Sequence, residues 1–420
     1  MIRPVIGTVA ARVAITAMNL LMIMAAGQLL GAEGLGTISL MVLGITFTLL
    51  LSHVVGGGGL VYLVPRYGVR ALLRPSYLWA ILCAIVAWSI QQVMPIVPLE
   101  MVDHVVALAF LQSLVSIHIN ILLGKERIGQ LNLVLVAQSA VQLLGFVFLM
   151  RMNGPSVLAY VHALYLAYGV AAVASGGLVV AHSGPRTSAA KPGALRAVFK
   201  QGGLAQGANL LQLLNYRLAY YLIEHFRGRS ALGIFSVTTQ LAESTWLIPK
   251  SIGGVLYSKV SNLAGSERQR DLTVILLKVS VGMALIGCLV LIVLPDGLYT
   301  TVFGPEVVGL HPLLLAMSPG LLAMAASQVL SHYLSGTGRI KHNTVASGLG
   351  LLVTIVFGFL LIPGYGLMGA AITASAAYCT AVAHQLRVFM RSSGTRPREL
   401  WPHARDGVRA REVWRRWRNR

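Results

Sequence analysis

Leu35-Gly36-Thr37-Ile38-Ser39 recurs in a weaker form as Leu232-Gly233-Ile234-Phe235-Ser236, 197 residues further along the chain. A second stretch, Gly124-Lys125-Glu126-Arg127-Ile128, recurs as Gly336-Thr337-Gly338-Arg339-Ile340 at an offset of 212 residues. Matches that keep their order at nearly the same offset indicate an internal duplication. The sequence therefore predicts two halves that fold alike, with a modest insertion in the second half between the two matches.

The offset of 197 residues also aligns chemically related residues within the two halves. It carries His53 onto Lys250 and the pair Gly56-Gly57 onto Gly253-Gly254. Both copies thus contain a basic residue, two intervening positions and a glycine pair. This third match supports the register of the duplication.

Long apolar segments surround the repeated motifs. Hydrophobic residues make up 56% of the 420 residues and charged residues 11%, and the mean hydropathy is +0.74. Such a composition leaves too little polar surface to cover a soluble globule. Each segment has ~20 residues, enough to cross the hydrocarbon core of a bilayer as a helix. The twelve predicted spans lie near residues 5–29, 37–64, 74–96, 102–123, 130–150, 155–181, 198–223, 231–257, 272–294, 308–335, 343–363 and 366–389.

The predicted fold class is an all-α polytopic membrane protein with two six-helix bundles. Six spans per half give both copies the same orientation, so a pseudo-twofold axis along the membrane normal relates them around a central cavity. The connections are too short to hold a soluble catalytic domain of ordinary size. The predicted domains are an N-terminal bundle (1–182), a cytoplasmic linker (183–197), a C-terminal bundle (198–390) and a basic cytoplasmic tail (391–420).

Basic residues predict the orientation of the chain in the membrane. Lys and Arg concentrate in the connections after the even-numbered spans, whereas the alternate connections carry only Arg151, Arg227 and Arg229. The positive-inside rule then places both termini in the cytoplasm. Topology accounts for much of the net charge of +20, so no nucleic-acid partner is expected.

The tail carries arginines interleaved with Trp401, Trp414 and Trp417. A basic amphipathic helix lying on anionic membrane lipids is the preferred interpretation of this pattern, and a solvated tail is the alternative.

Charged residues within the spans identify candidate cavity residues. A charge at membrane depth costs roughly 2.5–3.5 kcal/mol, so such residues normally face protein or water. Arg12, His53, Arg217 and Lys250 form a mostly cationic set that suits the phosphates of an anionic headgroup, whereas a cationic drug would favour carboxylates. Glu243 is a candidate for ion coupling. Alternatively, Arg12 and Lys250 extend to the interface, and Arg217 simply pairs with Glu243.

Local helix breakers accompany these residues. Pro249 precedes Lys250 and predicts a break or kink in the eighth span, and Gly56–Gly59 predict a loosened second span, with close helix packing as the alternative role of the glycines. Glu243 and Lys250 are seven residues apart, so a continuous helix would place them on one face.

Enzymatic and metal-binding functions have little support in the sequence. The cysteines Cys83, Cys288 and Cys379 lie within spans without metal-ligand spacing, and the histidines are scattered over different spans. We predict no cofactor and no metal site. A membrane-embedded glycosyltransferase or polymerase would need metal-binding acids or a catalytic loop outside the spans, and no connection supplies a good candidate. A transporter is therefore favoured over an enzyme.

The stretch Ala26-Gly27-Gln28-Leu29-Leu30-Gly31-Ala32-Glu33-Gly34-Leu35-Gly36-Thr37 resembles the first loop of bacterial Wzx-type polysaccharide flippases, which belong to the multidrug/oligosaccharidyl-lipid/polysaccharide exporter superfamily. In the second half, Leu232-Gly233-Ile234-Phe235-Ser236, the turn from Gly336 to Arg339, and Gly364-Tyr365-Gly366-Leu367-Met368-Gly369-Ala370-Ala371 are also similar to that family. The resemblance extends to about Arg391.

This resemblance implies a flippase of the bacterial cytoplasmic (inner) membrane that serves cell-surface polysaccharide biosynthesis. Such a protein moves a polyprenyl-diphosphate-linked oligosaccharide from the cytoplasmic to the outer leaflet by alternating access. Basic residues on the first, second, seventh and eighth helices would contact the diphosphate, which assigns that role by helix and depth to Arg12, His53, Arg217 and Lys250. A polysaccharide polymerase and chain-length proteins are the implied partners. A multidrug antiporter of the same superfamily is the alternative.

Overall fold

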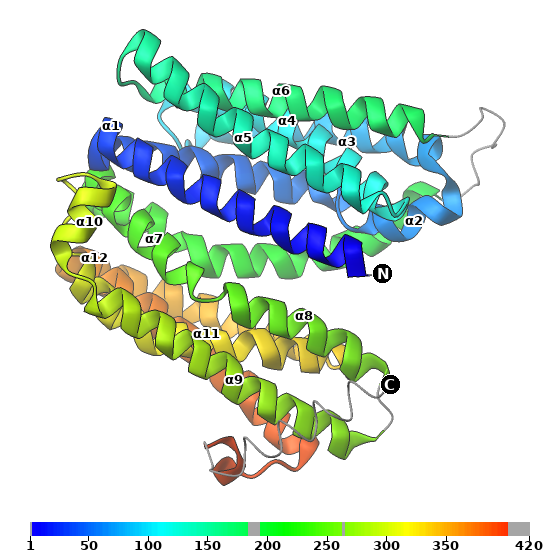
Figure 1. Ribbon diagram of the computed structural model, residues 1–420, viewed down its shortest axis with the longest axis vertical. Coiled ribbons are helices and arrows are strands. Elements are labelled where there is room, and N and C mark those ends of the chain that lie inside the picture. Colours follow the sequence, from blue (N-terminus) through cyan, green and yellow to red (C-terminus); the bar gives the residue numbers. More distant parts are fainter. Residues whose placement is uncertain (1, 184–193, 263–264, 402–420) are drawn as a thin grey trace. The chain divides into compact units, whose positions relative to one another are not determined.

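The computed structural model describes residues 2–183, 194–262 and 265–401, and every regular element in these ranges is a helix. The first half contains α1 (Ile2–Gly56), α2 (Gly59–Tyr67), α3 (Val69–Val93), α4 (Leu99–Gly124), α5 (Ile128–Asn153) and α6 (Val157–Ala181) (Figure 1). The second half contains α7 (Ala194–Ser244), α8 (Leu247–Asn262), α9 (Ser266–Val293), α10 (Asp296–Phe303), α11 (Leu310–Gly336), α12 (Lys341–Ser393) and the short 3₁₀ helix η1 (Pro397–Leu400). The predicted tail helix falls mainly on residues 402–420, and most of the predicted linker on 184–193, outside the described residues.

Three of the long helices each join two helical segments at one glycine. α1, α7 and α12 each contain one glycine with a positive φ, namely Gly31 (67°), Gly228 (82°) and Gly366 (57°). With ψ near ±180° or −130°, this conformation is open almost only to glycine, and it reverses the direction of a helix.

Eight helices in the described residues are long and apolar enough to cross a membrane. Two of them, the stretch Ala10–Val61 and α12, each hold two predicted spans. The predicted spans 198–223 and 231–257 lie in α7 and α8, which are not among the eight. The all-α polytopic fold class is confirmed.

The backbone repeats in the register that the sequence predicts. At an offset of 197, α3 and α9 begin at Val69 and Ser266; at 212, α4 and α11 end at Gly124 and Gly336. Residues with positive φ also recur in pairs. The pairs are Gly31 and Gly228, Gly68 and Gly265 at the first offset, and Glu126 and Gly338, Gly154 and Gly366 at the second. The predicted duplication is therefore confirmed by geometry as well as by residue identity.

The insertion that changes the offset lies between α9 and α11. Residues 294–309, which include α10, stand where the first half has only residues 94–98 between α3 and α4. The sequence predicted an insertion in the second half but not this extra helix, because eight residues are too few to give a span signal.

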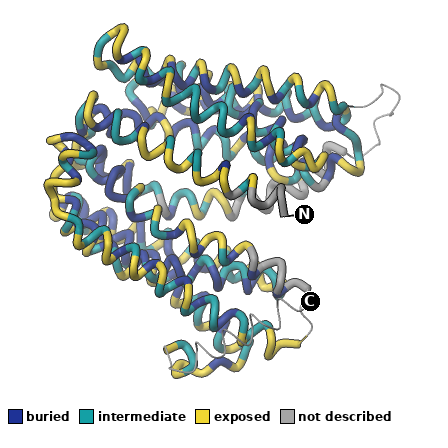
Figure 2. The backbone as a smooth tube through the Cα atoms, in the orientation of Figure 1, coloured by how far each residue is buried: buried dark blue, intermediate teal, exposed yellow. Residues whose placement is uncertain are grey.

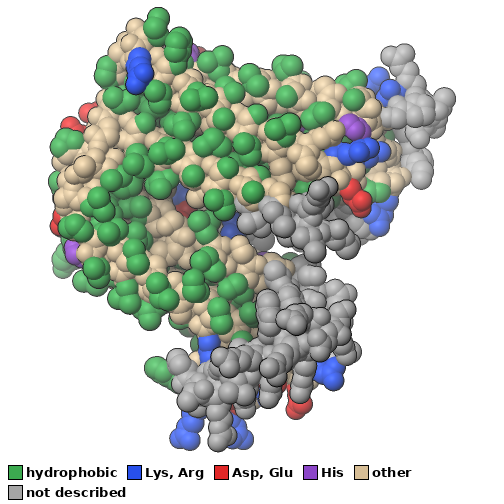
Figure 3. Space-filling view, viewed as in Figure 1, with side chains coloured by type: hydrophobic (Ala, Val, Ile, Leu, Met, Phe, Trp, Pro, Cys, Tyr) green, Lys and Arg blue, Asp and Glu red, His purple; other side chains and the backbone are tan. Residues whose placement is uncertain are grey.

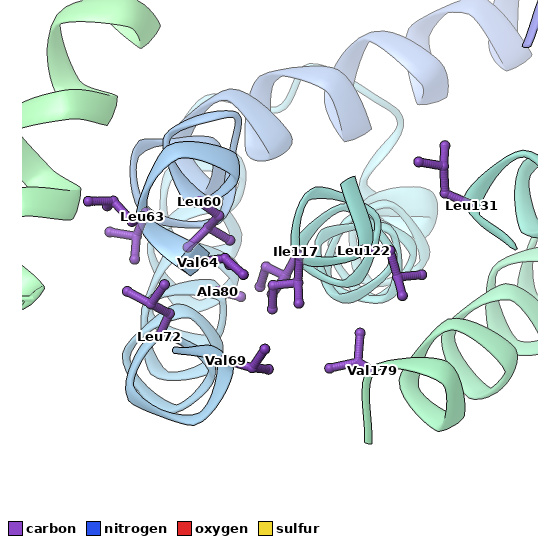
Figure 4. Packing of buried hydrophobic residues seen from close by; sticks show 12 residues of the cluster. Leu60, Leu63, Val64, Val69, Leu72, Ala80, Ile117, Leu122, Leu131 and Val179 are labelled. Atoms are coloured by element: carbon purple, nitrogen blue, oxygen red, sulfur yellow. The ribbon is translucent and has the colours of Figure 1, made fainter. Parts of the chain in front are cut away.

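Each half has its own apolar core, and the two cores use equivalent positions. In the first half, buried side chains of α2, α3 and α4 pack together (Figure 4). Leu63, Ala80, Ile117, Ile121 and Leu122 of this core correspond, at the two offsets, to Val260, Leu277, Val329, Tyr333 and Leu334 of the second core. Packing thus repeats along with the backbone.

The outward faces of the helices carry apolar side chains. Buried and exposed positions alternate along α5 and α6, so each helix turns one face toward its neighbours (Figure 2). Leu133, Leu144 and Phe148 of α5 are largely exposed. Figure 3 shows hydrophobic side chains spread over this face and Lys and Arg toward the helix ends. Such faces are suited to lipid hydrocarbon.

Contacts divide the chain into two compact units. The first consists of Met1–Leu210, Arg229–Gly233 and Thr300–Val307, and the second of Leu211–Gly228, Ile234–Tyr299 and Val308–Arg420. The domain limits drawn from the sequence stay a prediction.

The two repeated Leu-Gly motifs meet within the first unit in a reciprocal contact. A Cβ on Gly36 would lie 2.0 Å from the carbonyl oxygen of Arg229, and a Cβ on Gly233 would lie 1.8 Å from that of Ala32. Because the offset of 197 exchanges both partners, the contact has the form of a twofold interface. The motif is therefore repeated because each copy packs its glycine against the turn of the other.

The α10 segment packs against the same turn. Glu306 accepts a hydrogen bond from the Ala32 backbone N–H at 2.7 Å, next to the Gly31 reversal, and the Gln28 side-chain amide donates to the carbonyl of Thr301. Glycines allow the close approach, since a Cβ on Gly27 would lie 2.0 Å from the carbonyl oxygen of Phe303. These contacts explain why Thr300–Val307 belongs to the first unit.

Replacing Gly36 by alanine is expected to lower the free energy of unfolding by about 1–3 kcal/mol, because the added methyl must displace backbone rather than a movable side chain. Gly169→Ala on α6 is the matched control, since its Cβ would meet open space; it should be neutral or stabilise by up to ~1 kcal/mol. Unfolding in detergent, followed by tryptophan fluorescence, measures both. Equal stability of the two variants would contradict the proposed packing role.

Candidate functional site

Arg217 and Glu243 form an ion pair in the second unit. Arg217 lies on α7 before the Gly228 reversal and Glu243 lies after it, so the fold of the helix brings them together. The Arg217 Nη2 atom lies 3.1 Å from Glu243 Oε1 and donates to Oε2 at 3.2 Å. Their side chains are 25% and 31% exposed, so the pair is reachable from outside the packed core. The pairing that the sequence left as an alternative for Arg217 is present.

A chain of hydrogen bonds fixes the orientation of this pair. The Arg217 Nη1 group donates to the Tyr220 hydroxyl at 2.6 Å, and the guanidinium carbon lies 4.9 Å from the centroid of the Tyr220 ring. The Tyr220 hydroxyl also bonds the Thr239 hydroxyl, which donates to the Ser236 carbonyl at 3.0 Å. A guanidinium held by a carboxylate, a hydroxyl and an aromatic ring is an oriented charge rather than a freely moving one.

His53 occupies a polar site in the first unit. Its Nε2 atom lies 2.8 Å from the Ser116 hydroxyl on α4, and the Asn120 amide donates to the Ser116 carbonyl at 2.8 Å. Gly56 permits this close approach of α1 to α4, since a Cβ there would lie 2.7 Å from Ile117 Cγ1. α1 ends at Gly56 and α2 begins at Gly59, so the predicted loosening is confirmed, and the packing role of the glycine holds as well.

Lys250 lies in the first turn of α8 and its side chain is exposed. α7 ends at Ser244 and α8 begins at Leu247, so the helix is interrupted at Thr245-Trp246, and Thr245 lies four residues before Pro249. Proline lacks the N–H that would bond the carbonyl four residues earlier and clashes with that carbonyl, which explains the position of the break. The predicted kink is confirmed. The continuous helix assumed when Glu243 and Lys250 were placed on one face is wrong.

Arg12 lies on α1 with an exposed side chain. Within the described residues neither Arg12 nor Lys250 takes part in an ion pair. The two cations thus differ from Arg217, whose charge is already matched by a carboxylate. Arg12 and His53 belong to the first unit, and Arg217, Glu243 and Lys250 to the second. Their joint role as a cavity lining stays a prediction.

The second unit contains a polar cavity that is not among the sites predicted from the sequence. It lies among α7, α11 and α12 and is lined largely by neutral polar side chains. A signal was present on α11, where Ser327, Ser331 and Ser335 recur every fourth residue with Gln328 and His332 beside them. The side chains on this face are neutral, so charge does not distinguish it in the sequence.

Buried histidine and cysteine side chains play packing roles in the described part of the chain. The two ring nitrogens of His118 form hydrogen bonds, Nε2 with the Tyr77 hydroxyl at 2.5 Å and Nδ1 with the Ser175 hydroxyl at 2.8 Å. Cys83 and Cys288 are buried and unbridged. Among the described residues, no group of three or more His, Cys, Asp or Glu could hold a metal ion.

Comparison with known proteins gives one family match and one curated relative. The family model described as MatE matches residues 206–360. The "Capsular polysaccharide biosynthesis protein CapF" of Staphylococcus aureus is 30% identical over 169 residues. That match spans 40% of this chain and 43% of the relative, so the chain spans less than half the length of the curated relative that it matches.

The fold is similar to that of solved transporters. A multidrug resistance MATE family transporter of the MOP superfamily, in an inward-facing conformation, superposes with a TM-score of 0.73 at 14% identity over 90% of this chain and 94% of that chain. The lipid II flippase MurJ, in an inward closed conformation, gives a TM-score of 0.69 at 15% identity over 95% and 89%. The family match covers residues 206–360, and the likeness to the two solved structures, at 14% and 15% identity, shows a shared fold.

Proposed function

We propose that this protein is a flippase that moves a polyprenyl-diphosphate-linked oligosaccharide from the cytoplasmic to the outer leaflet of a bacterial inner membrane, by alternating access, for cell-surface polysaccharide biosynthesis. The observation that carries the proposal is a difference between the basic residues: one has an acidic partner, and two have none among the described residues. Lys250 and Arg12 are exposed and unpaired among the described residues, whereas Arg217 is matched by Glu243. Unpaired cations on apolar helices favour an anionic ligand such as a diphosphate.

The comparisons support a glycan as the cargo. The curated relative carries a name from capsular polysaccharide biosynthesis, and one structural neighbour is a lipid II flippase. A polysaccharide polymerase and chain-length proteins are the partners that we propose. The excess of Lys and Arg in alternate connections supports cytoplasmic termini.

A multidrug antiporter is the second candidate. It is favoured by the similarity to a multidrug transporter and by the Glu243 carboxylate, which is 31% exposed and could exchange a cation or a proton. Arg217 argues against this reading, because it already neutralises that carboxylate.

Reconstitution into proteoliposomes tests the proposal. The substrate is a fluorescent polyprenyl diphosphate that carries one N-acetylhexosamine, and dithionite quenches the label once the lipid reaches the outer leaflet of the vesicle. In vesicles with the wild-type protein, the rate of lipid movement is expected to be at least tenfold higher than in empty vesicles. Ethidium uptake driven by a proton or sodium gradient is the comparison assay. Ethidium transport without movement of the lipid would reject the flippase in favour of the antiporter.

A further inference from the structure

The polar cavity of the second unit has a volume of about 250 Å³. Its walls come from α7, α11 and α12, and Gln212 at its edge is exposed, so a ligand can enter. The volume is that of roughly eight waters at ~30 Å³ each. It is just under the ~300 Å³ at which typical small-molecule pockets begin. The space is far larger than a bare metal ion and about right for one small ring.

A connected network of side chains holds the polar groups in place. Ser327 donates to Gln385 Oε1 at 2.8 Å, and Gln385 Nε2 donates to Asn343 Oδ1 at 3.2 Å. Asn343 Nδ2 in turn donates to the Ser331 carbonyl at 2.9 Å and to the Ser335 hydroxyl at 3.1 Å. The network joins α11 to both ends of α12, so its amides and hydroxyls are oriented before any ligand arrives.

The duplication indicates that the fold does not need most of this polarity. At the two offsets, the cavity residues Asn215, Ser327, Ser331, Ser335, Asn343, Ser347 and Gln385 correspond to Met18, Val115, Ile119, Leu123, Leu131, Leu135 and Val173 of the first half. Gln328 and His332 correspond instead to Ser116 and Asn120, so these two positions are polar in both copies. The same backbone is therefore built with apolar side chains at the other positions in the first copy. Packing explains the apolar version, and the polar version requires another reason.

The chemistry of the lining selects the class of ligand. Among the described residues, the polar side chains of the lining are amides, hydroxyls and one imidazole, and none is a carboxylate, lysine or arginine. Amides offer donors and acceptors side by side, which matches the hydroxyl groups of a sugar. A cation would meet N–H groups as well as oxygens, and an anion would find no positive charge. Met324, Ala346 and Ala381 supply an apolar wall for the C–H face of a ring.

The cavity lies next to the helix that carries Lys250. A Cβ on Gly253 of α8 would lie 2.3 Å from the Gln328 carbonyl oxygen and 2.7 Å from His332 Nδ1, both on the cavity wall. Lys250 precedes Gly253 by three residues, just under one helical turn and ~4.5 Å along the axis. A diphosphate bound by Lys250 would thus hold its first sugar close to the cavity.

We propose that this cavity binds one neutral sugar ring of the lipid-linked cargo and so selects glycosylated lipid over bare polyprenyl diphosphate. The inference rests on the proposed flippase function and adds a second contact, separate from the charged groups. Its role is recognition of the sugar after the diphosphate has been engaged.

Two variants test the proposal in the reconstituted full-length protein. Ser347→Leu fills the cavity without removing any hydrogen bond of the network, and Gln385→Leu removes the central amide. Each is expected to slow the flipping of polyprenyl diphosphate bearing N-acetylglucosamine at least tenfold, and to leave flipping of sugar-free polyprenyl diphosphate within twofold of wild type. Ser318→Ala, on α11 but outside the cavity, is the control and should change neither rate.

Other outcomes distinguish failure of the sugar site from failure of the flippase function. If both lipids slow equally in the variants, the cavity does not read the sugar, although the flippase function stands. If the defect occurs in sodium buffer and vanishes in choline buffer, the cavity is a cation site and the inference is wrong. If the wild type moves neither lipid, the flippase function itself fails.

A measurement on the wild type avoids any folding defect of the variants. Excess free N-acetylglucosamine is expected to inhibit flipping of the glycosylated lipid and not of the sugar-free lipid. Equal inhibition of both, or of neither, would overturn the sugar site.

Discussion

Lys250→Ala is expected to slow the flipping of lipid diphosphate by about ten- to a hundredfold, which corresponds to the ~1.5–3 kcal/mol contributed by a hydrogen bond to a charged group. The thermal stability of the variant should equal that of the wild type, because Lys250 is exposed and forms no ion pair among the described residues. Dithionite accessibility of a fluorescent polyprenyl diphosphate in proteoliposomes measures the rate, and unfolding in detergent measures the stability.

Two further variants identify the cause of the effect. Lys250→Arg keeps the charge and should retain most of the flipping rate, since a guanidinium can also bond phosphate oxygens. Lys341→Ala removes an exposed lysine at the start of α12 and should leave the rate unchanged, as expected for a residue that serves topology alone. Wild-type flipping by Lys250→Ala would remove this residue from the proposed diphosphate site.

The sequence predicted most of the fold because the fold is recorded in simple repeated signals. Long apolar runs located the spans, and glycine-containing motifs gave two offsets. The backbone reproduces the first offset at Gly31 and Gly228 and the second at Gly154 and Gly366. The duplication also explains why these glycines are needed, since Gly36 and Gly233 pack against each other's turns. The helix α10 escaped prediction because it is short and belongs to the insertion, where the other half offers no counterpart.

The candidate site was predicted less completely, for a different physical reason. Charges at membrane depth are rare and conspicuous, so Arg217 and Glu243 could be selected from the sequence, but whether they pair depends on the reversal at Gly228. Neutral polar side chains have no such signature. Asn343 and Gln385 are distant from Ser327 in the chain, and only the packing of α11 on α12 brings them into one network.

The two halves share one fold, so a comparison of equivalent positions separates residues that the fold needs from residues that have another role. Positions with apolar residues in both copies, such as Ile117 and Val329, are explained by the shared core. Positions that are apolar in one copy and polar in the other mark what the second half does beyond folding. Arg217 corresponds to Leu20 at the offset of 197. Since the first half forms the same fold with a leucine at this position, an arginine there is not required for the fold.

Arg217→Met is expected to lower the free energy of unfolding by about 3 kcal/mol, the lower end of the ~3–5 kcal/mol found when one partner of a buried ion pair is removed. The lower end applies because the two side chains retain 25% and 31% of their exposure. Glu243 would be left as an unmatched carboxylate, and the Tyr220 hydroxyl would lose its bond to the guanidinium. Unfolding in detergent, followed by tryptophan fluorescence, measures the loss.

The double variant Arg217→Met/Glu243→Leu separates structure from transport. Removing both charges should restore stability to within about 1 kcal/mol of wild type, because a pair replaced by apolar side chains of similar volume is often neutral or stabilising. If the pair serves ion coupling, the restored protein still flips lipid diphosphate at least tenfold more slowly, and its rate no longer responds to an imposed proton or sodium gradient. If the double variant flips at the wild-type rate with an unchanged gradient response, the pair is purely structural, and the coupling group must be sought elsewhere in the chain.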